Sequence, residues 1–270
     1  MTETSGKVCL CGVRLDALSM SEVMSRVERT IETRTSLAIS AVNVAKLVNM
    51  HRDPLLREGV ESGDLVLADG MPLVWLSRLK GQLLPERVAG IDLMYVLFKL
   101  ADQRALRVFL LGAKHDTLER VVRIVREEYP NAMIVGYRDG YFREHEYEEV
   151  ARSVRDAQPD ILLVAISSPK KELFMRRWSG LMNVPVCHGV GGSFDVMAGL
   201  TRRAPKWMQR SGLEWFYRLL QEPRRMWKRY LVTNVLFTGL VVYDLAHWYL
   251  GGRACKTTIT RKDDEHGPSR

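Results

Sequence analysis

The chain has 270 residues, enough for one large domain or for one domain with an extension. Hydrophobic residues make up 46% and charged residues 27% of it, which excludes a disordered or collagen-like chain. The net charge of +8 is concentrated in one place: residues 1–200 hold 26 basic and 26 acidic side chains, whereas residues 201–230 hold 9 basic and 2 acidic ones. We therefore expect a negatively charged partner to meet the protein at residues 201–230.

Short apolar runs alternate along the chain with longer segments of helical composition. Val8–Leu15 predicts an opening strand or half of a hairpin. Buried strands are predicted at Leu37–Val42, Leu65–Ala68, Val108–Leu111, Met133–Val135, Ile161–Ile166 and Val184–Cys187. Helices are predicted at Ser21–Arg34, Val44–Glu61, Gly90–Arg104, Asp116–Tyr129, Glu144–Ala157 and Glu172–Leu181. This alternation predicts an α/β fold: a mostly parallel, Rossmann-like sheet with helices on both faces.

The composition changes near residue 200. Ten of the 22 Phe, Trp and Tyr residues lie between 201 and 250, among the basic side chains. We expect an α/β core at 1–200, a basic and aromatic helical appendage at 201–256, and a polar, disordered tail at 257–270. The run Leu231–Tyr243 is apolar for thirteen residues, shorter than the ~20 of a membrane-spanning helix, and predicts a helix that lies in the membrane interface.

The four cysteines and the N-terminus indicate a cellular compartment. Cys9 and Cys11 alternate faces on a predicted strand and have no histidine cluster beside them, so we expect no zinc site. The first twelve residues lack the charged and apolar regions of a signal peptide. A cytoplasmic, reduced protein is the expectation.

Polar residues follow several of the predicted strands, where ligands bind in open parallel sheets. Asp69 follows one strand and is a candidate base; its alternative role is the turn that Asp-Gly pairs commonly form. Asn43 follows another, either as a helix cap or as a ligand contact. The glycine-rich turn after His188, with Gly189, Gly191 and Gly192, could hold a phosphate or simply reverse the chain.

Two patterns that would define other sites are missing. The glycines come late and lack the G-x-G-x-x-G spacing after a first strand, which disfavours a dehydrogenase. No D-x-D follows a strand, so the usual carboxylate clamp for a nucleotide-bound Mg²⁺ is missing as well. A bound diphosphate would then be neutralised by arginines, which the basic segment supplies.

Several motifs together resemble the WecG/TagA/CpsF family of bacterial glycosyltransferases. In chain order they are Ala68–Trp75, Glu86–Leu93, Phe109–Gly112, Gly140–Phe142, Pro159–Leu162, Gly189–Asp195, Arg203–Trp207, Gly212–Trp215 and Glu222–Arg225. The resemblance extends from about residue 8 to residue 240. It implies that Asp69 is the catalytic base, and that Asn43 and Arg87 bind substrate. For Arg87, pairing with Glu86 or Asp92 remains the alternative.

The resemblance also implies an activity. Family members are inverting, metal-independent enzymes that need no cofactor and transfer a sugar, usually from a UDP-sugar donor, to a polyprenyl-diphosphate-linked sugar at the cytoplasmic membrane face. Their products are exopolysaccharide, capsule or wall polymers. Their C-terminal appendage binds the membrane and closes over the site, and Arg218, Arg224 and Arg225 are the counterparts expected to bind the diphosphate. The expected partners are thus donor, acceptor and an anionic membrane surface, without nucleic acid.

This chain departs from the family pattern at two positions. Ala41 stands where a threonine is common, and Lys171 stands where the family usually has glutamine. Lys171 adds a cation to a substrate-binding loop, so donor or acceptor can differ from those of members that transfer N-acetylmannosamine. The alternative functions are a non-catalytic nucleic-acid-binding module and an inactive membrane-associated scaffold. Apolar surface beside the appendage also suggests a homo-oligomer.

Overall fold

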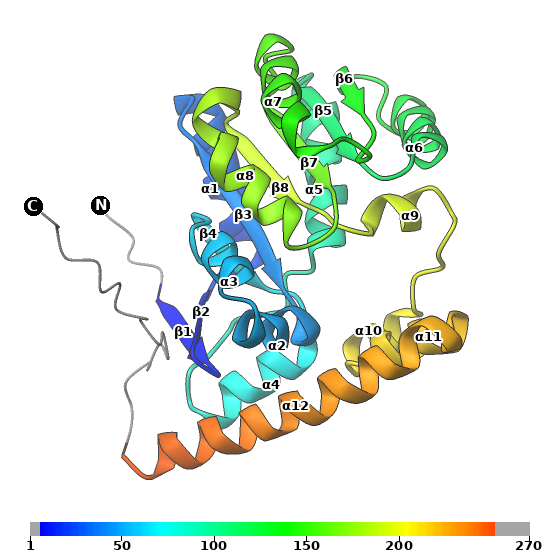
Figure 1. The fold of residues 1–270 in the computed structure, drawn as a ribbon. Coiled ribbons are helices and arrows are strands. Elements are labelled where there is room, and N and C mark those ends of the chain that lie inside the picture. Colours follow the sequence, from blue (N-terminus) through cyan, green and yellow to red (C-terminus); the bar gives the residue numbers. More distant parts are fainter. Residues whose placement is uncertain (1–5, 252–270) are drawn as a thin grey trace, which may run out of the picture.

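The computed structural model describes residues 6–251, and its centre is one parallel β-sheet (Figure 1). Six strands lie in the order β4-β3-β8-β7-β5-β6, and every neighbouring pair is parallel. The strands are β3 (Leu37–Val42), β4 (Leu65–Ala68), β5 (Arg107–Gly112), β6 (Met133–Arg138), β7 (Ile161–Ala165) and β8 (Val186–Gly189). The predicted α/β class is therefore confirmed.

The opening segment is a separate antiparallel hairpin of β1 (Lys7–Leu10) and β2 (Val13–Asp16). Its two turn residues, Cys11 and Gly12, have positive φ angles of 47° and 70°, as a tight two-residue hairpin turn requires. The buried carboxylate of Asp16 accepts a hydrogen bond from the Val66 N–H at 2.8 Å, which anchors the hairpin beside β4.

Helices cover both faces of the sheet because strands such as β3, β4 and β7 are largely apolar and buried on both sides. On one face lie α1 (Met20–Thr33), α5 (Gly90–Arg104) and α6 (His115–Glu128), whose buried side chains share one core with β3, β5 and β7. On the other face lie α2 (Val44–Arg52), α3 (Pro54–Glu61), α4 (Met71–Leu79), α7 (Tyr147–Asp156), preceded by the 3₁₀ turn η1 (Glu144–Glu146), and α8 (Lys170–Met182).

One local prediction was wrong, and one helix was missed. The single helix expected over Val44–Glu61 is broken at Asp53-Pro54, because proline cannot donate to the preceding turn and the Asp53 carboxylate caps α3 by accepting the Leu56 N–H at 3.0 Å. Helix α4 is not among the predicted helices, because the Asp69-Gly70 pair indicates only a turn or a site. Gly70 stands directly before α4 without a side-chain cap.

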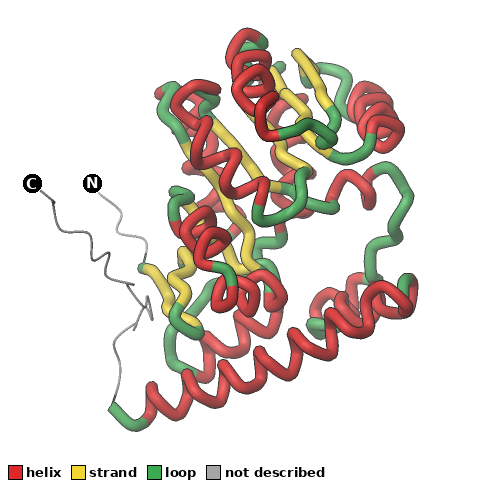
Figure 2. The backbone as a smooth tube through the Cα atoms, in the orientation of Figure 1, coloured by secondary structure: helices red, strands yellow, loops and turns green. Residues whose placement is uncertain are grey.

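The appendage begins after α9 (Ser193–Met197), where a loop leads away from the sheet (Figure 2). It consists of α10 (Lys206–Arg210), α11 (Glu214–Gln221) and the long helix α12 (Pro223–Tyr249), which runs past α2 and α4 (Figure 1). Phe237, Leu240, Val241 and Leu245 line one face of α12 and pack on the core formed with the hairpin. The stretch Tyr230–Tyr249 is long and apolar enough to cross a membrane, judged by length and composition alone.

A buried ion pair holds α12 on the core. Lys80 Nζ lies 2.8 Å from Asp244 Oδ2, and the same oxygen accepts the Cys11 N–H at 2.9 Å. Lys80 is 5% exposed, and its ammonium also lies 4.9 Å from the centre of the Trp248 ring. Asp244 therefore fixes α12 to both the hairpin and the end of α4.

Replacing Asp244 by alanine is expected to lower the free energy of unfolding by about 3 kcal/mol, because it leaves the buried Lys80 charge without its counterion. Urea denaturation followed by circular dichroism measures the change. Glu148→Ala, which breaks the exposed pair with Arg152, is the matched control and should cost less than about 1 kcal/mol. Equal losses for the two variants would contradict a structural role for the Lys80–Asp244 pair.

Candidate active site

Polar residues gather at the carboxyl ends of four neighbouring strands. Asp69 follows β4, Asn43 follows β3, the glycine-rich turn follows β8, and Lys171 lies in the first turn of α8, after β7. Because β4, β3, β8 and β7 are consecutive in the sheet and strands lie about 4.8 Å apart, these groups line one edge. We call Asn43, Asp69, Lys171 and Gly189–Gly192 the strand-end site.

Asp69 occupies a desolvated position with charged neighbours. Burial raises the pKa of its carboxyl, while the positive charge of Arg87 and a backbone hydrogen bond from Gly90 work in the opposite direction. Gly90 is the first residue of α5, so the carboxyl group faces the positive end of that helix. A carboxylate whose pKa is raised is suited to accept a proton near neutral pH.

Asn43 caps a helix, as one of the two sequence interpretations proposed. Its Oδ1 accepts the Lys46 N–H at 2.9 Å at the start of α2. The side chain is exposed, and the cap bond uses only its oxygen. The amide nitrogen of Asn43 thus keeps its capacity to donate to a ligand beside Asp69.

Lys171 is almost completely buried beneath the glycine-rich turn. A methyl group at Gly189 would lie 2.8 Å from Lys171 Cε, so any larger residue there would displace the end of the lysine side chain. Lys171 and Lys46 lie 3.5 and 3.0 Å from the same Glu172 oxygen, which also accepts the Ser168 hydroxyl at 2.9 Å. Burial, followed by the charge of Lys46, lowers the pKa of Lys171 to about 8.

His188 is a buried residue of β8 that packs next to the strand-end site. It is completely buried, and its Nε2 lies 3.0 Å from the Gly90 carbonyl oxygen. Burial lowers its pKa to about 4, so the ring is neutral at pH 7. It packs between β3 and α5 as a structural residue.

Of the three appendage arginines expected to bind the diphosphate, the structure places Arg218 at the glycine-rich turn. Its Nη2 lies 3.5 Å from where a methyl group on Gly192 would be. Its Nε is buried and has no hydrogen-bond partner among residues 6–251. Arg224 lies exposed in the first turn of α12, and the Arg225 side chain lies outside the described part of the structure.

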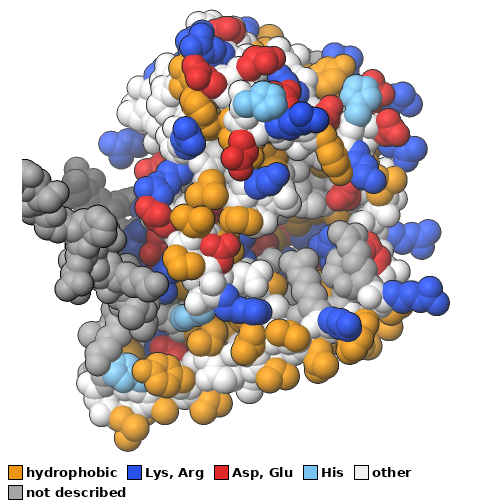
Figure 3. Space-filling view, in the orientation of Figure 1, with side chains coloured by type: hydrophobic (Ala, Val, Ile, Leu, Met, Phe, Trp, Pro, Cys, Tyr) orange, Lys and Arg blue, Asp and Glu red, His pale blue; other side chains and the backbone are white. Residues whose placement is uncertain are grey.

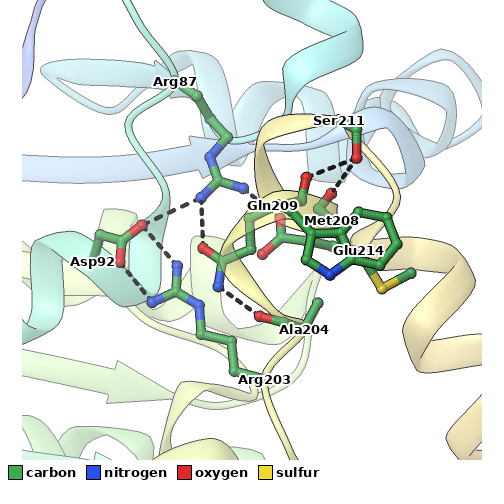
Figure 4. A network of polar contacts seen from close by, with 9 residues as sticks. Arg87, Asp92, Arg203, Ala204, Met208, Gln209, Ser211 and Glu214 are labelled. Carbon is green, nitrogen blue, oxygen red and sulfur yellow. Dashed lines mark hydrogen bonds and ion pairs between the residues drawn. The ribbon is translucent and has the colours of Figure 1, made fainter.

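Arg87 is committed to an ion-pair network between the core and the appendage (Figure 4). Its guanidinium binds Glu214 of α11 and lies 3.4 Å from Asp92 of α5, while Arg203 binds the two Asp92 oxygens at 2.6 and 2.7 Å. Its pairing with Asp92 was one of the sequence alternatives. Glu86, the other, accepts the Met20 N–H instead.

Sequence reasoning missed Glu214 and Arg203 as members of this site. Burial raises the pKa of Glu214, against the effect of Arg87. A signal was available, because Glu214 is one of only two acidic residues among nine basic ones in residues 201–230. A partly buried acid in a basic segment indicates a specific partner rather than a solvated surface.

Comparison with known proteins places the chain in a family. A model of the glycosyl transferase WecG/TagA/CpsF family matches residues 8–249, so the chain belongs to that family, and both the resemblance and the assignment to the glycosyltransferases are confirmed. The chain is 39% identical over 201 residues to a protein of Bacillus subtilis (strain 168) named N-acetylglucosaminyldiphosphoundecaprenol N-acetyl-beta-D-mannosaminyltransferase, covering 74% of this chain and 77% of that protein. A protein of the same name from Bacillus spizizenii (strain ATCC 23059 / NRRL B-14472 / W23) is 36% identical over 195 residues, covering 72% and 75%.

The buried position of Lys171 predicts a pH-dependent stability. Folding lowers its pKa to about 8 from an unfolded value of about 10.4, so between these values the unfolded chain binds more protons and stability rises with pH. Urea denaturation at pH 7 to 10 should therefore show wild type gaining stability relative to Lys171→Gln. Lys170→Gln removes the same charge from the exposed neighbouring position and is the control. The same pH trend for both variants, each measured against wild type, would contradict a buried ammonium at Lys171.

Proposed function

We propose that the protein is an inverting glycosyltransferase that moves a sugar from a UDP-sugar to a polyprenyl-diphosphate-linked sugar, for a bacterial exopolysaccharide, capsule or wall polymer. The observation that carries this proposal is the strand-end site: a desolvated Asp69 at the same sheet edge as a glycine-rich turn that Arg218 contacts. The names of the two Bacillus relatives support the acceptor class, since both name a diphosphoundecaprenol-linked sugar.

The proposed reaction is a single displacement. Asp69 accepts the proton of an acceptor hydroxyl while that oxygen attacks the anomeric carbon of the donor. The bond from this carbon to the UDP oxygen breaks, and UDP leaves with the bonding electron pair. One displacement inverts the configuration and needs one base. Arg218 and the backbone N–H groups of Gly189–Gly192 stabilise the charge that develops on the leaving diphosphate, without a requirement for a metal ion.

Lys171 distinguishes this site from the usual family pattern. Its ammonium lies against Gly189 and within electrostatic reach of Asp69, on the side where the donor would bind. We propose that it binds a donor group, such as a diphosphate oxygen or a sugar oxygen, which a glutamine would bind without charge. The identity of the donor sugar therefore depends on this position.

Asp69→Asn should reduce kcat by about 10²–10⁴, the effect of losing a general base. In wild type, kcat/KM should fall at acid pH with a pKa above the ordinary aspartate value of about 3.9, because burial favours the protonated carboxyl. Product formation from radiolabelled UDP-sugar measures both. Asp156→Asn, an exposed position at the end of α7 that precedes the amino end of β7, is the control. Wild-type turnover by Asp69→Asn would exclude Asp69 as the base.

We further propose that the appendage holds the enzyme on the cytoplasmic face of the membrane. The outward side of α12 carries a row of exposed apolar residues (Figure 3): Leu231, Val232, Val235, Leu236 and Val242. Basic residues precede this row, which suits a surface of anionic headgroups over an apolar interior. The opposite side of α12 packs on the core, which favours a helix lying on the membrane over one that spans it.

Leu231→Ser with Val235→Ser should lower binding to anionic vesicles by about tenfold or more, because both side chains are exposed and lose apolar contact with lipid. Co-sedimentation with phosphatidylglycerol vesicles measures binding. Met133→Ser with Tyr137→Ser, exposed on the distant edge strand β6, is the matched control. Unchanged vesicle binding, or retention of wild type by a single-stranded oligonucleotide instead of vesicles, would contradict membrane docking and favour the nucleic-acid alternative.

A further inference from the structure

A second basic pocket lies beside the strand-end site. It has a volume of about 340 Å³ and lies between the start of α4, the start of α5 and α10. Its lining includes Arg87, Asp92, Arg203, Lys206, Gln209 and Arg210. None of the glycines of the turn after β8 lines it, nor do Lys171 and Arg218. The pocket is thus separate from the position proposed for the donor diphosphate.

The pocket has an excess of positive charge that is not used within the protein. Four lining residues are cationic and one, Asp92, is anionic. Asp92 is already bound by Arg203 and Arg87, and Arg87 also pairs with Glu214, so the unused charge is that of Lys206 and Arg210. Lys206 and Arg210 form no ion pair within residues 6–251, and the buried Nε of Arg203 has no hydrogen-bond partner in this part of the chain. Such a set of donors is suited to an anion with several oxygens.

The pocket lies near Asp69, the proposed base, and near the surface that is proposed to contact the membrane. Met71, which also lines it, lies two residues after Asp69, and Arg203 is close enough to Asp69 for their charges to interact. On the outside, Trp207 of α10 is 64% exposed next to Lys206. An anion held here would therefore lie between the proposed base and the surface proposed to contact lipid.

We propose that this pocket binds the diphosphate of the polyprenyl-linked acceptor. The inference rests on the proposed function, in which both substrates carry a diphosphate. The donor diphosphate leaves in the reaction, whereas the acceptor diphosphate stays intact and positions the sugar that is attacked. Two separate anion sites are then required, one on each side of the reacting atoms. The turn with Arg218 is the donor site, and the pocket with Arg203, Lys206 and Arg210 is the acceptor site.

The test compares two double variants that remove the same charges. Lys206→Gln with Arg210→Gln removes two exposed pocket cations, and Arg120→Gln with Arg123→Gln removes two exposed cations of α6, outside the pocket and the appendage. With a soluble short-chain polyprenyl-diphosphate sugar, the pocket variant should raise the acceptor KM by about tenfold or more, the effect of losing charged hydrogen bonds. The donor KM and the control variant should change less than twofold. A raised donor KM with an unchanged acceptor KM would overturn the assignment.

Binding of inorganic diphosphate, measured by calorimetry in the presence of saturating UDP, tests the pocket independently of activity. Wild type and the control variant should bind it, and the pocket variant should bind about tenfold more weakly. Failure of wild type to bind diphosphate while UDP is bound would overturn the second anion site. If wild type binds diphosphate through the pocket but transfers no sugar from any UDP-sugar, the proposed function fails while the anion pocket stands.

Discussion

Arg87 joins the C-terminal appendage to the carboxyl ends of the strands, and the arrangement of the site depends on it. Its guanidinium is held between Glu214 of α11 and Asp92 of α5, and Asp92 in turn holds Arg203. Arg87 is largely buried, whereas Asp92 and Glu214 are partly exposed, so the guanidinium depends on these two carboxylates for its counterions. The same guanidinium lowers the pKa of Asp69 against the effect of burial. One side chain thus connects the position of the appendage with the proton affinity of the proposed base.

The appendage performs two tasks on different surfaces. Its inner surface brings Arg218 to the glycine-rich turn and Arg203 to Asp92, whereas its outer surface presents the exposed apolar row of α12. The Lys80–Asp244 pair and the apolar face around Leu240 attach α12 to the core, and thereby fix the position of both surfaces relative to the sheet. A lipid-linked acceptor proposed to enter from the membrane would therefore reach the site at Asp69, the proposed base, rather than at the glycine-rich turn that is proposed to bind the donor.

The order of the core elements could be predicted because local patterns determine it. The apolar runs at Leu37–Val42 and Leu65–Ala68 end where β3 and β4 end, which placed Asn43 and Asp69 at the sheet edge. The break at Asp53-Pro54 also had a local signal, a capping aspartate before a proline. Other features have no local signal, since Arg87 and Glu214 are 127 residues apart and only the folded chain brings them together. The assignment of Arg218 came from the resemblance and not from spacing.

We propose that the strand-end site transfers a sugar to a polyprenyl-diphosphate-linked acceptor with inversion. The most direct measurement incubates the full-length protein with a panel of UDP-sugars and a short-chain polyprenyl-diphosphate-linked N-acetylglucosamine, and determines the anomeric configuration of the product by NMR. We expect one donor to extend the lipid and its α-linked sugar to become β-linked, as a single displacement by one base requires. An α-linked product, or no product from any donor, would contradict the account.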